Sequence, residues 1–143
     1  MRPVGVGIIG CGNISPAYLR AAKKFPILDI VALADLNPAA AERRSAEFGV
    51  PARSIEALLA DPGIEIVLNL TIPKAHVEVG LRAVAAGEAK GVRIGCAPDT
   101  FLGGSHQTAR KLIDEGAIGR PIGGTAFFMC PGHERWHPNP GFY

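Results

Sequence analysis

A glycine-rich turn between an apolar run and a helix start, near the beginning of the chain, constrains the fold more than any other feature. Val4–Gly10 is a continuous apolar run, which is typical of a strand buried on both faces. The turn that follows has the pattern Gly10-x-Gly12-x-x-Ser15. Ser15 is expected to cap the next helix, and Pro16 suits the first helical position. The pattern predicts a strand–turn–helix unit of an α/β sheet.

Apolar runs and helix signals alternate along the rest of the chain. Further strands are expected at Leu28–Ala34, Ile64–Leu70, Val92–Ala97 and Thr125–Cys130, with a minor strand at Val50–Arg53. Helices are expected at Pro16–Lys24, Ala39–Phe48, Ser54–Ala60, Lys74–Ala86 and Ser105–Glu115. Strands that alternate with helices form right-handed βαβ units. The sequence therefore predicts an α/β fold with a doubly wound, mainly parallel Rossmann-type sheet and helices on both faces.

Several helix ends carry capping signals. Asn37 is expected to cap the second helix, and Gly49 after that helix suits a left-handed C-terminal conformation. The fourth helix is expected to stop at Gly87. The last helix is expected to turn its apolar residues inward, namely Ala109, Leu112 and Ile113.

Three polar or glycine-rich segments follow predicted strands: Gly10–Ser15, Asp35–Asn37 and Thr71–His76. In open parallel sheets, ligands bind beyond the carboxyl ends of the strands. We therefore expect these three segments to meet at one edge of the sheet and to form a binding site there.

The first two segments have the spacing of a dinucleotide site. Gly10 permits the tight turn, and Gly12 lets a pyrophosphate approach the backbone beside the N–H donors of a helix N-terminus. Asp35 ends the second strand about 20 residues further on, where a carboxylate accepts hydrogen bonds from a ribose 2′-hydroxyl. That carboxylate would repel a 2′-phosphate, so NAD is favoured over NADP. Arg43 and Arg44 are expected to be solvated residues of a helix face.

Two other interpretations of the glycine turn stay open at this point. One is a plain strand–helix turn, which the position of Asp35 disfavours. The other is an S-adenosylmethionine enzyme, whose third glycine would fall at Ile14, and the isoleucine there disfavours that class. Cys11 is interpreted as a small residue whose backbone serves the turn.

The histidines give weaker signals. His76 lies on the first turn of the helix after Thr71 and Pro73, so its ring either faces the cofactor crevice or is a structural part of the helix. His133 and His137 have a metal-like interval but no third ligand, so no metal site is expected.

Charge and composition exclude several classes of function. The formal net charge is +2 and aromatic residues make up 6% of the chain, whereas a nucleic-acid interface needs a basic stripe interleaved with aromatic residues. The first apolar run is too short to span a membrane and no targeting signal follows it, so the cytoplasm is expected. The cysteines form no C-x-x-C pair, which predicts neither a disulfide framework nor a zinc ribbon.

Four segments resemble the nicotinamide-dependent oxidoreductases of the Gfo/Idh/MocA family: GIIGCGNIS, ALADLNPAAA, NLTIPKAH and AIGRPIGGTAFF. The resemblance implies an N-terminal Rossmann domain, a C-terminal α/β domain that lines the substrate site, and hydride transfer to or from sugars, cyclitols or related polyols. It further implies that the pyrophosphate contacts Gly10, Gly12, Asn13 and Ile14, that the adenosine ribose contacts Asp35 and Asn37, and that the nicotinamide side contacts Thr71, Pro73 and His76.

The chain departs from the family pattern at two places. The family has a strand ending in Glu-Lys-Pro, whose lysine moves the proton at the reacting carbonyl, and here residues 87–91 lead directly to Val92–Ala97. A strand–helix unit therefore looks skipped, and Val92–Ala97 is expected to pair with Ile64–Leu70, which would place Cys96 and Ala97 opposite the missing glutamate and lysine. Asp99 is then the nearest candidate acid or base.

The second departure concerns domain organisation. Residues 1–120 are expected to form the dinucleotide-binding domain, and residues 121–143 the start of a truncated second domain. The catalytic residues stay unknown, and we expect a chain that binds NAD but is inactive or nearly so. The alternatives are a non-catalytic nucleotide-binding module and a partner-binding module that forms a homo-oligomer through an uncovered apolar edge.

Overall fold

The computed structural model describes residues 2–88, 103–125, 127 and 129. The chain divides into two units, and the described residues 2–88 belong to the first of them while the described residues from 103 onward belong to the second. The strand expected at Val92–Ala97, its pairing and residues Cys96, Ala97 and Asp99 lie outside the described residues.

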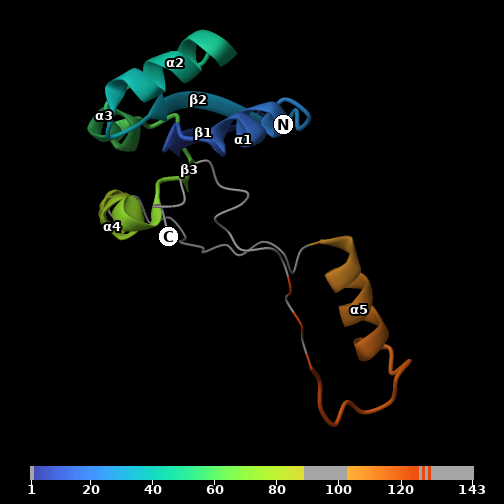
Figure 1. Ribbon diagram of the computed structural model, residues 1–143. Helices are drawn as coiled ribbons and strands as arrows, with labels where there is room; N and C mark the ends of the chain where they lie inside the picture. Colours follow the sequence, from blue (N-terminus) through green and yellow to red (C-terminus); the bar gives the residue numbers. More distant parts are fainter. Residues whose placement is uncertain (1, 89–102, 126, 128, 130–143) are drawn as a thin grey trace. The chain divides into compact units, whose positions relative to one another are not determined.

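The first unit is built on a parallel sheet of three strands in the order β2-β1-β3 (Figure 1). The strands are β1 at Val4–Ile9, β2 at Leu28–Ala34 and β3 at Ile66–Asn69. β3 is shorter than the apolar run predicted, yet pairing continues on both sides of it: the N–H of Glu65 donates to the carbonyl of Gly5 at 2.8 Å, and that of Leu70 to the carbonyl of Ile9 at 2.7 Å. The predicted parallel sheet is confirmed.

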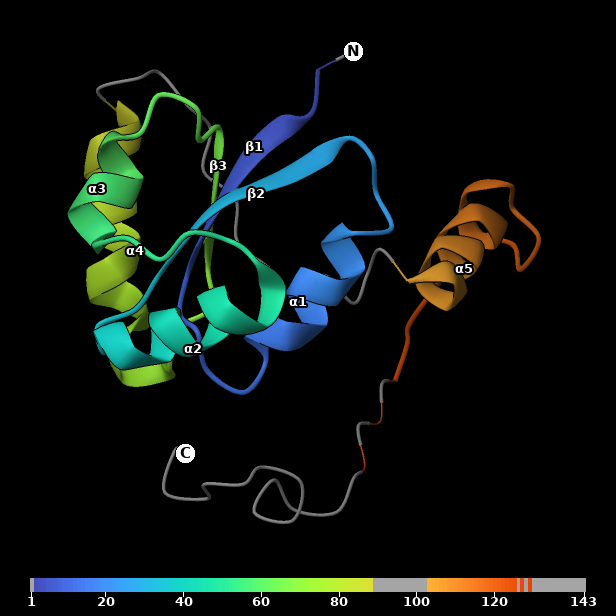
Figure 2. The ribbon, with the colours of Figure 1, turned by 90° about the horizontal axis from the view of Figure 1, so that it is seen from above.

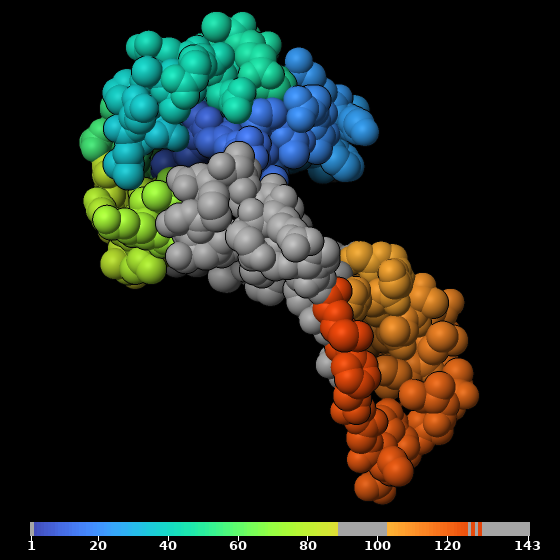
Figure 3. All heavy atoms as spheres, in the orientation of Figure 1, coloured from blue at the N-terminus to red at the C-terminus, as the bar shows by residue number. Residues whose placement is uncertain are grey.

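Four helices of this unit cover both faces of the sheet: α1 at Ser15–Ala22, α2 at Pro38–Phe48, α3 at Ile55–Ala60 and α4 at Pro73–Glu88. Figure 2 shows α3 and α4 together on one side of the strands. In the space-filling view, the teal atoms of α2 lie beside the blue atoms of the segment that contains β1, α1 and β2 (Figure 3). Because each strand is apolar on both faces, it needs a helical layer on each side, as the doubly wound prediction requires.

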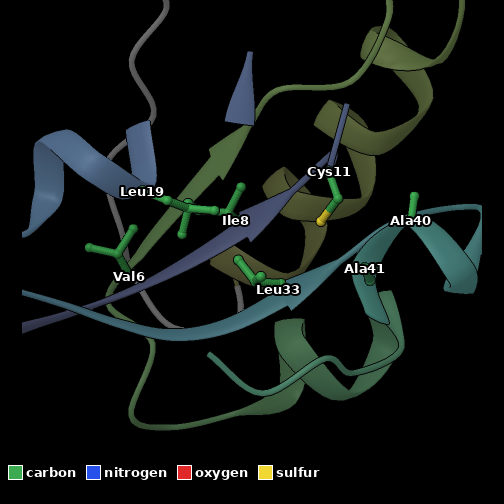
Figure 4. Close-up of a cluster of buried hydrophobic side chains, with 7 residues drawn as sticks. All are labelled: Val6, Ile8, Cys11, Leu19, Leu33, Ala40 and Ala41. Carbon is green, nitrogen blue, oxygen red and sulfur yellow. The ribbon is translucent and has the colours of Figure 1, made fainter. Parts of the chain in front are cut away.

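Two apolar clusters separate the layers. On the face of α1 and α2, the buried side chains are Val6, Ile8, Cys11, Leu19, Leu33, Ala40 and Ala41 (Figure 4). On the face of α3 and α4, they are Ile9, Ala32, Ala34, Ile55, Leu58, Ile64 and Val79. Ile8 and Ile9 are both fully buried although they are consecutive, because side chains of a strand alternate between the two faces. Complete burial of each contributes roughly 1.5–3 kcal/mol.

Of the two predicted N-terminal caps, at Ser15 and Asn37, the one at Asn37 forms as expected, and the structure adds a third cap at Ser54, which the sequence places inside the helix. The side chain of Asn37 accepts a hydrogen bond from the N–H of Ala39 at 3.2 Å, and Gly49 ends the same helix with φ at 74°. The Ser54 hydroxyl accepts from the N–H of Ala57 at 3.1 Å. The cap predicted at Ser15 is wrong: Ile14 takes that position without a side-chain cap, because the hydroxyl of Ser15 donates instead to the carbonyl of Gly12 at 2.8 Å.

Two other local predictions are also wrong. α4 continues through Gly87 to Glu88, and Gly87 is buried inside the helix. A buried helix face favours the smallest side chain, so packing overrides the preference of glycine for a helix end. The minor strand at Val50–Arg53 is a single bridge between Ala52 and Leu33.

The second unit contains α5 at Gly104–Asp114, followed by Gly116 at φ 74°. The predicted inward packing of α5 is wrong for the described residues: Leu112 and Ile113 are 44% and 43% exposed, and no residue of the helix is buried. Of the strand expected at 125–130, Thr125, Phe127 and Met129 carry no strand assignment, and residues 126, 128 and 130 lie outside the description.

Within residues 2–88 and 103–125, no helix has the length and the apolar run that crossing a bilayer requires. The same part of the chain holds no group of three or more metal-ligating side chains.

Candidate functional site

The three strands end side by side, as the sequence predicts. Ile9 is paired with Ala34 of β2 and with Asn69 of β3, so the segments that follow these residues start at one edge of the sheet. The N–H of Gly10 donates to the carbonyl of Ala34 at 2.8 Å, which extends the pairing by one residue. The carboxyl edge therefore brings together the glycine turn, the β2 end and the β3 end.

The two glycines of the turn differ in their surroundings. Gly10 has φ at +107°, and a Cβ on it would lie 2.5 Å from the carbonyl carbon of Leu70. Both the backbone conformation and the contact with the β3 end thus require glycine at position 10. A Cβ on Gly12 would meet no atom within 4 Å. The backbone at Gly12 is therefore open to a ligand, while that at Gly10 is packed.

The carboxylate of Asp35 links the glycine turn to the β2 end through hydrogen bonds to both. One carboxylate oxygen accepts from the N–H of Cys11 at 2.7 Å, and the other accepts from the N–H of Asn37 at 2.8 Å. A carboxylate has about four acceptor positions, so each oxygen keeps capacity for a hydroxyl donor. The half-buried Asp35 is thereby held in one orientation and can still accept from a ligand.

Cys11 turns its side chain away from the open side of the turn. Its sulfur points into the apolar cluster (Figure 4), lies 3.5 Å from the carbonyl oxygen of Ala34, and the residue is 3% exposed. Burial, with a smaller contribution from the charge of Asp35 that Arg44 partly offsets, raises the pKa of the thiol to about 11. The thiol is neutral at ordinary pH, and the backbone N–H is the group that Cys11 offers to the site.

Arg44 also reaches the glycine turn, so the prediction of a solvated residue is wrong for it. Its Nε donates to the Ser15 hydroxyl at 3.3 Å and its Nη2 to the Gly12 carbonyl at 3.3 Å, while Nη1 pairs with Glu47 at 2.6 Å. Arg43 is exposed, as predicted. Helical spacing contains the signal that distinguishes them: position 44 follows the buried Ala40 by four residues and the buried Ala41 by three, whereas position 43 has such a spacing from Ala40 alone.

The β3 end forms its own hydrogen-bonded turn, and it depends on Asn69, which sequence reasoning missed. The Asn69 Oδ1 accepts from the N–H of Thr71 at 3.1 Å and from its hydroxyl at 2.6 Å. The Asn69 Nδ2 donates to the carbonyl of His76 at 3.0 Å, on the first turn of α4. An Asn side chain at a strand end commonly accepts from the backbone N–H two residues further on, so this residue could have been found.

The geometry around His76 selects one tautomer of its ring. Nδ1 lies 3.3 Å from the carbonyl oxygen of Thr71 and 3.4 Å from the Thr71 hydroxyl. A carbonyl only accepts, and that hydroxyl already donates to Asn69, so Nδ1 must carry the proton in the neutral ring. Nε2 is then the acceptor, and the exposed His76 offers it to solvent or a ligand.

The remaining predicted residues lie at the N-termini of helices on this edge. Asn13 and Ile14 directly precede α1, and Ile14 is 52% exposed. Pro73 is the first residue of α4 and is exposed. The N–H groups at the start of a helix attract anions.

A cavity of about 460 Å³ lies beyond the end of β2. Its lining includes Asp35 and Leu36 from that strand end, together with Arg53, Ile55 and Arg82. Both arginines have carboxylate partners: Arg53 pairs with Asp61, and Arg82 pairs with Glu56. A hydrogen bond from its own backbone, followed by those from the side chains of Arg82 and Ser54, holds the pKa of Glu56 below its usual range. Sequence reasoning missed the cavity because its walls come from three helices.

Comparison with known proteins identifies the family. The model of an oxidoreductase family with an NAD-binding Rossmann fold, the Gfo/Idh/MocA family, matches residues 4–90. An acetaldehyde dehydrogenase of Geobacillus genomosp. 3 is 34% identical over 91 residues, which cover 61% of this chain and 30% of that protein. An inositol 2-dehydrogenase/D-chiro-inositol 3-dehydrogenase of Lactiplantibacillus plantarum is 27% identical over 145 residues, covering 82% and 41%. The chain thus spans less than half the length of these relatives.

Solved structures share the fold. The WlbA dehydrogenase from Bordetella pertussis, in complex with NADH and UDP-GlcNAcA, has a TM-score of 0.67 at 24% identity, and the likeness covers 83% of this chain and 44% of that one. A likeness at this level of identity concerns the fold, which agrees with the sheet and helix layers described above. Because the family model matches more than half of the chain, the protein belongs to the Gfo/Idh/MocA family of oxidoreductases, whose NAD-binding Rossmann fold it carries.

Proposed function

We propose that this chain is the cofactor-binding part of an oxidoreductase that acts on a sugar, a cyclitol or a related polyol. The observation that carries the proposal is the contrast between the packed Gly10 and the open Gly12 beside the oriented carboxylate of Asp35. An open backbone, a helix N-terminus and a carboxylate with spare acceptor capacity fit the pyrophosphate and ribose of NAD.

The pyrophosphate would lie against Gly10, Gly12, Asn13 and Ile14. The open space at Gly12 is what a phosphate needs to approach the backbone, and the start of α1 supplies N–H donors with a partial positive charge. Gly10 contributes indirectly, because its packing against Leu70 lets the turn fold back over the strand end.

The adenosine part would contact Asp35 and Asn37 and enter the cavity beyond β2. A volume of about 460 Å³ lies within the range of small-ligand pockets. Asp35 would accept from the ribose hydroxyls with the positions that its two backbone donors leave open. The arginines at the cavity are already paired with carboxylates, so the site supports NAD rather than the 2′-phosphate of NADP.

The nicotinamide side would contact Thr71, Pro73 and His76. NAD, when bound, accepts or supplies the hydride. The chain itself orients the ring from the β3 turn, which Asn69 holds rigid through its three hydrogen bonds. His76 would accept a hydrogen bond at Nε2, since Nδ1 faces the Thr71 carbonyl.

The substrate class comes from the inositol dehydrogenase relative, and the sequence indicates weak catalysis. An acetaldehyde dehydrogenase also matches 61% of the chain, so the likeness of this part alone does not select the substrate. The family's Glu-Lys-Pro segment has no counterpart at residues 87–91, where Lys90 stands in the sequence Glu-Ala-Lys-Gly and is no obvious substitute for its lysine. Loss of a general base lowers turnover about 10²–10⁴-fold, and we therefore propose that this chain by itself is inactive or nearly so.

Calorimetric titration of the chain with NADH tests the cofactor site. We expect one binding event per chain, weaker binding of NADPH, and loss of binding in Gly12→Val, whose side chain would fill the open approach. Turnover of a polyol panel, followed by NADH formation, tests the catalytic proposal. Clear turnover would contradict the inactivity, and an absence of NADH binding would contradict the site.

A partner-binding role is the second candidate, and the second unit favours it. α5 buries none of its residues, and Leu112, Ile113 and Ile118 are exposed. A self-associating chain would show a concentration-dependent mass in sedimentation equilibrium, and Leu112→Glu would abolish it. A monomer at all concentrations would contradict this role.

A further inference from the structure

Ser15 occupies the third small position of the glycine motif, and its hydroxyl makes two hydrogen bonds there. Ser15 is completely buried, and its hydroxyl donates to the Gly12 carbonyl at 2.8 Å. The same hydroxyl accepts from Nε of Arg44, whose Nη2 donates to that carbonyl as well. We call this group, made of Ser15, Arg44 and the Gly12 carbonyl, the turn clamp.

We infer that the turn clamp fixes the peptide between Gly12 and Asn13 in one orientation, and that Arg44 is a positioning residue for the dinucleotide pyrophosphate. This inference rests on the proposed function of the glycine turn. A trans peptide is planar, so its carbonyl and N–H point in opposite directions. The chain has no cis peptide bond among its described residues. With the Gly12 carbonyl held toward α2, the Asn13 N–H points to the opposite side.

The position of the clamp matters because nothing else in the described part of the chain packs against the Cα of Gly12 on its open side. No atom would lie within 4 Å of a Cβ there, and glycine adopts many backbone conformations. The property that lets a phosphate approach would therefore also let the peptide rotate. Two donors on one carbonyl, one from the buried Ser15 and one from the half-buried Arg44, remove that freedom without closing the open side.

The turn clamp acts by orienting the peptide between Gly12 and Asn13 more than by attracting the ligand with the charge of Arg44. Nη1 of Arg44 lies 2.6 Å from Glu47, and the arginine side chain is only 25% exposed, so its charge is largely balanced on α2. A free cation would attract the pyrophosphate over a distance and would be screened by salt. An oriented Asn13 N–H raises the fraction of chains ready to bind, which salt screening affects little.

Arg44→Met tests the inference, and Arg43→Met is its matched control, since Arg43 is the exposed neighbour on the same helix. In the full chain, Arg44→Met should weaken NADH and ADP-ribose binding about 3- to 10-fold, the effect of losing one or two hydrogen bonds that hold the binding-competent state. The loss should be equal at low and high salt. Adenosine, which lacks a pyrophosphate, should bind both variants as it binds the unaltered chain.

A readout without ligand separates positioning from general stability. The backbone amide resonance of Asn13 should broaden or split in Arg44→Met and in Ser15→Ala, and it should stay sharp in Arg43→Met. Ser15→Ala keeps a small buried side chain, so it gives the test if Arg44→Met fails to fold. A partial recovery of ADP-ribose affinity in Arg44→Lys would support the clamp, because lysine can donate to one of the two acceptors.

The possible failures are distinguishable. Equal ADP-ribose affinity in the Arg44→Met and Arg43→Met variants, with an unaltered chain that binds, would overturn the clamp and leave the proposed function standing. An equal loss for adenosine and ADP-ribose would also overturn it, since that result describes a structural residue. An unaltered chain that binds neither NADH nor ADP-ribose would overturn the proposed function and the inference together.

Discussion

The turn after β1 and the turn after β3 lie at the same sheet edge but are held in different ways. Besides one local hydrogen bond from Ser15, the glycine turn is held by residues far away in sequence: Asp35 accepts from the Cys11 N–H, Arg44 donates to the Gly12 carbonyl, and the Leu70 backbone packs on Gly10. The β3 turn is held by its own residues, since Asn69 binds groups two and seven positions further on. The first turn therefore forms only within the folded unit, whereas the second is largely determined by local sequence.

This difference predicts where a substitution acts. A change in the glycine turn should affect the free energy of unfolding of the whole unit, because it breaks contacts between strands and helices. A change in the β3 turn should stay local and should affect mainly the nicotinamide side. The four predictions below test this division, from the largest expected effect to the smallest.

Gly10→Ala should have the largest effect, a loss of about 3 kcal/mol in the free energy of unfolding. The new Cβ would meet the backbone of Leu70 at 2.5 Å, and φ at +107° is strained for any other residue. Urea denaturation measures the loss. Gly12→Ala is the control, because its Cβ would meet nothing: its stability should change by less than about 0.5 kcal/mol, while NADH binding weakens. Equal stability losses at both positions would contradict the contrast.

Cys11 should make the stability of the first unit sensitive to alkaline pH. Burial raises its pKa from 9.0 to about 11 in the folded state, so the unfolded chain releases the thiol proton first as the pH rises. Folding stability is then intact below pH about 9 and falls between pH about 9 and 11, by at most about 3 kcal/mol. Urea denaturation across this range measures the fall, and Cys11→Ala should flatten it. An unchanged slope in that variant would assign the sensitivity to other groups.

Asp35→Asn should destabilise the glycine turn by about 1–3 kcal/mol, because an amide nitrogen would face one of the two N–H donors that the carboxylate satisfies. The preference for NAD over NADP should also shrink, since the repelling charge is gone. Differential scanning calorimetry and dinucleotide titrations measure the two effects. Asp29→Asn, at the exposed opposite end of β2, is the control and should leave both values unchanged. A retained NAD preference in Asp35→Asn would contradict the role of the charge.

Asn69→Ala should have the smallest effect on stability, about 1 kcal/mol, because the hydrogen bonds lost are local and partly replaced by water. ADP-ribose should bind as before, and NADH should bind more weakly, since only the nicotinamide side loses support. Paired calorimetric titrations with the two ligands separate these outcomes. Weaker ADP-ribose binding would show that the two turns are coupled.

Sequence reasoning located most of the fold and the segments of the candidate site. β2 has the predicted bounds, and the Asn37 cap and the left-handed Gly49 are where the residue types place them. It failed at Ser15, because its hydroxyl donates to the nearby Gly12 carbonyl and does not cap the helix, and at Arg44, because the partners of that side chain depend on how α2 packs against the glycine turn. It failed at Gly87 for a similar reason, since burial of a helix face decided the helix end.

The sequence by itself determined the alternation of strands and helices, the glycine turn and the carboxylate at the β2 end, because apolar periodicity and the conformational range of glycine are local properties. Only the tertiary structure decided which atoms meet at the sheet edge. Asp35 reaches the Cys11 N–H and Arg44 reaches the Gly12 carbonyl because β1 and β2 are paired in register and α2 packs beside α1. Hydrogen bonds between residues 24 and 32 positions apart depend on that packing, which no local pattern encodes.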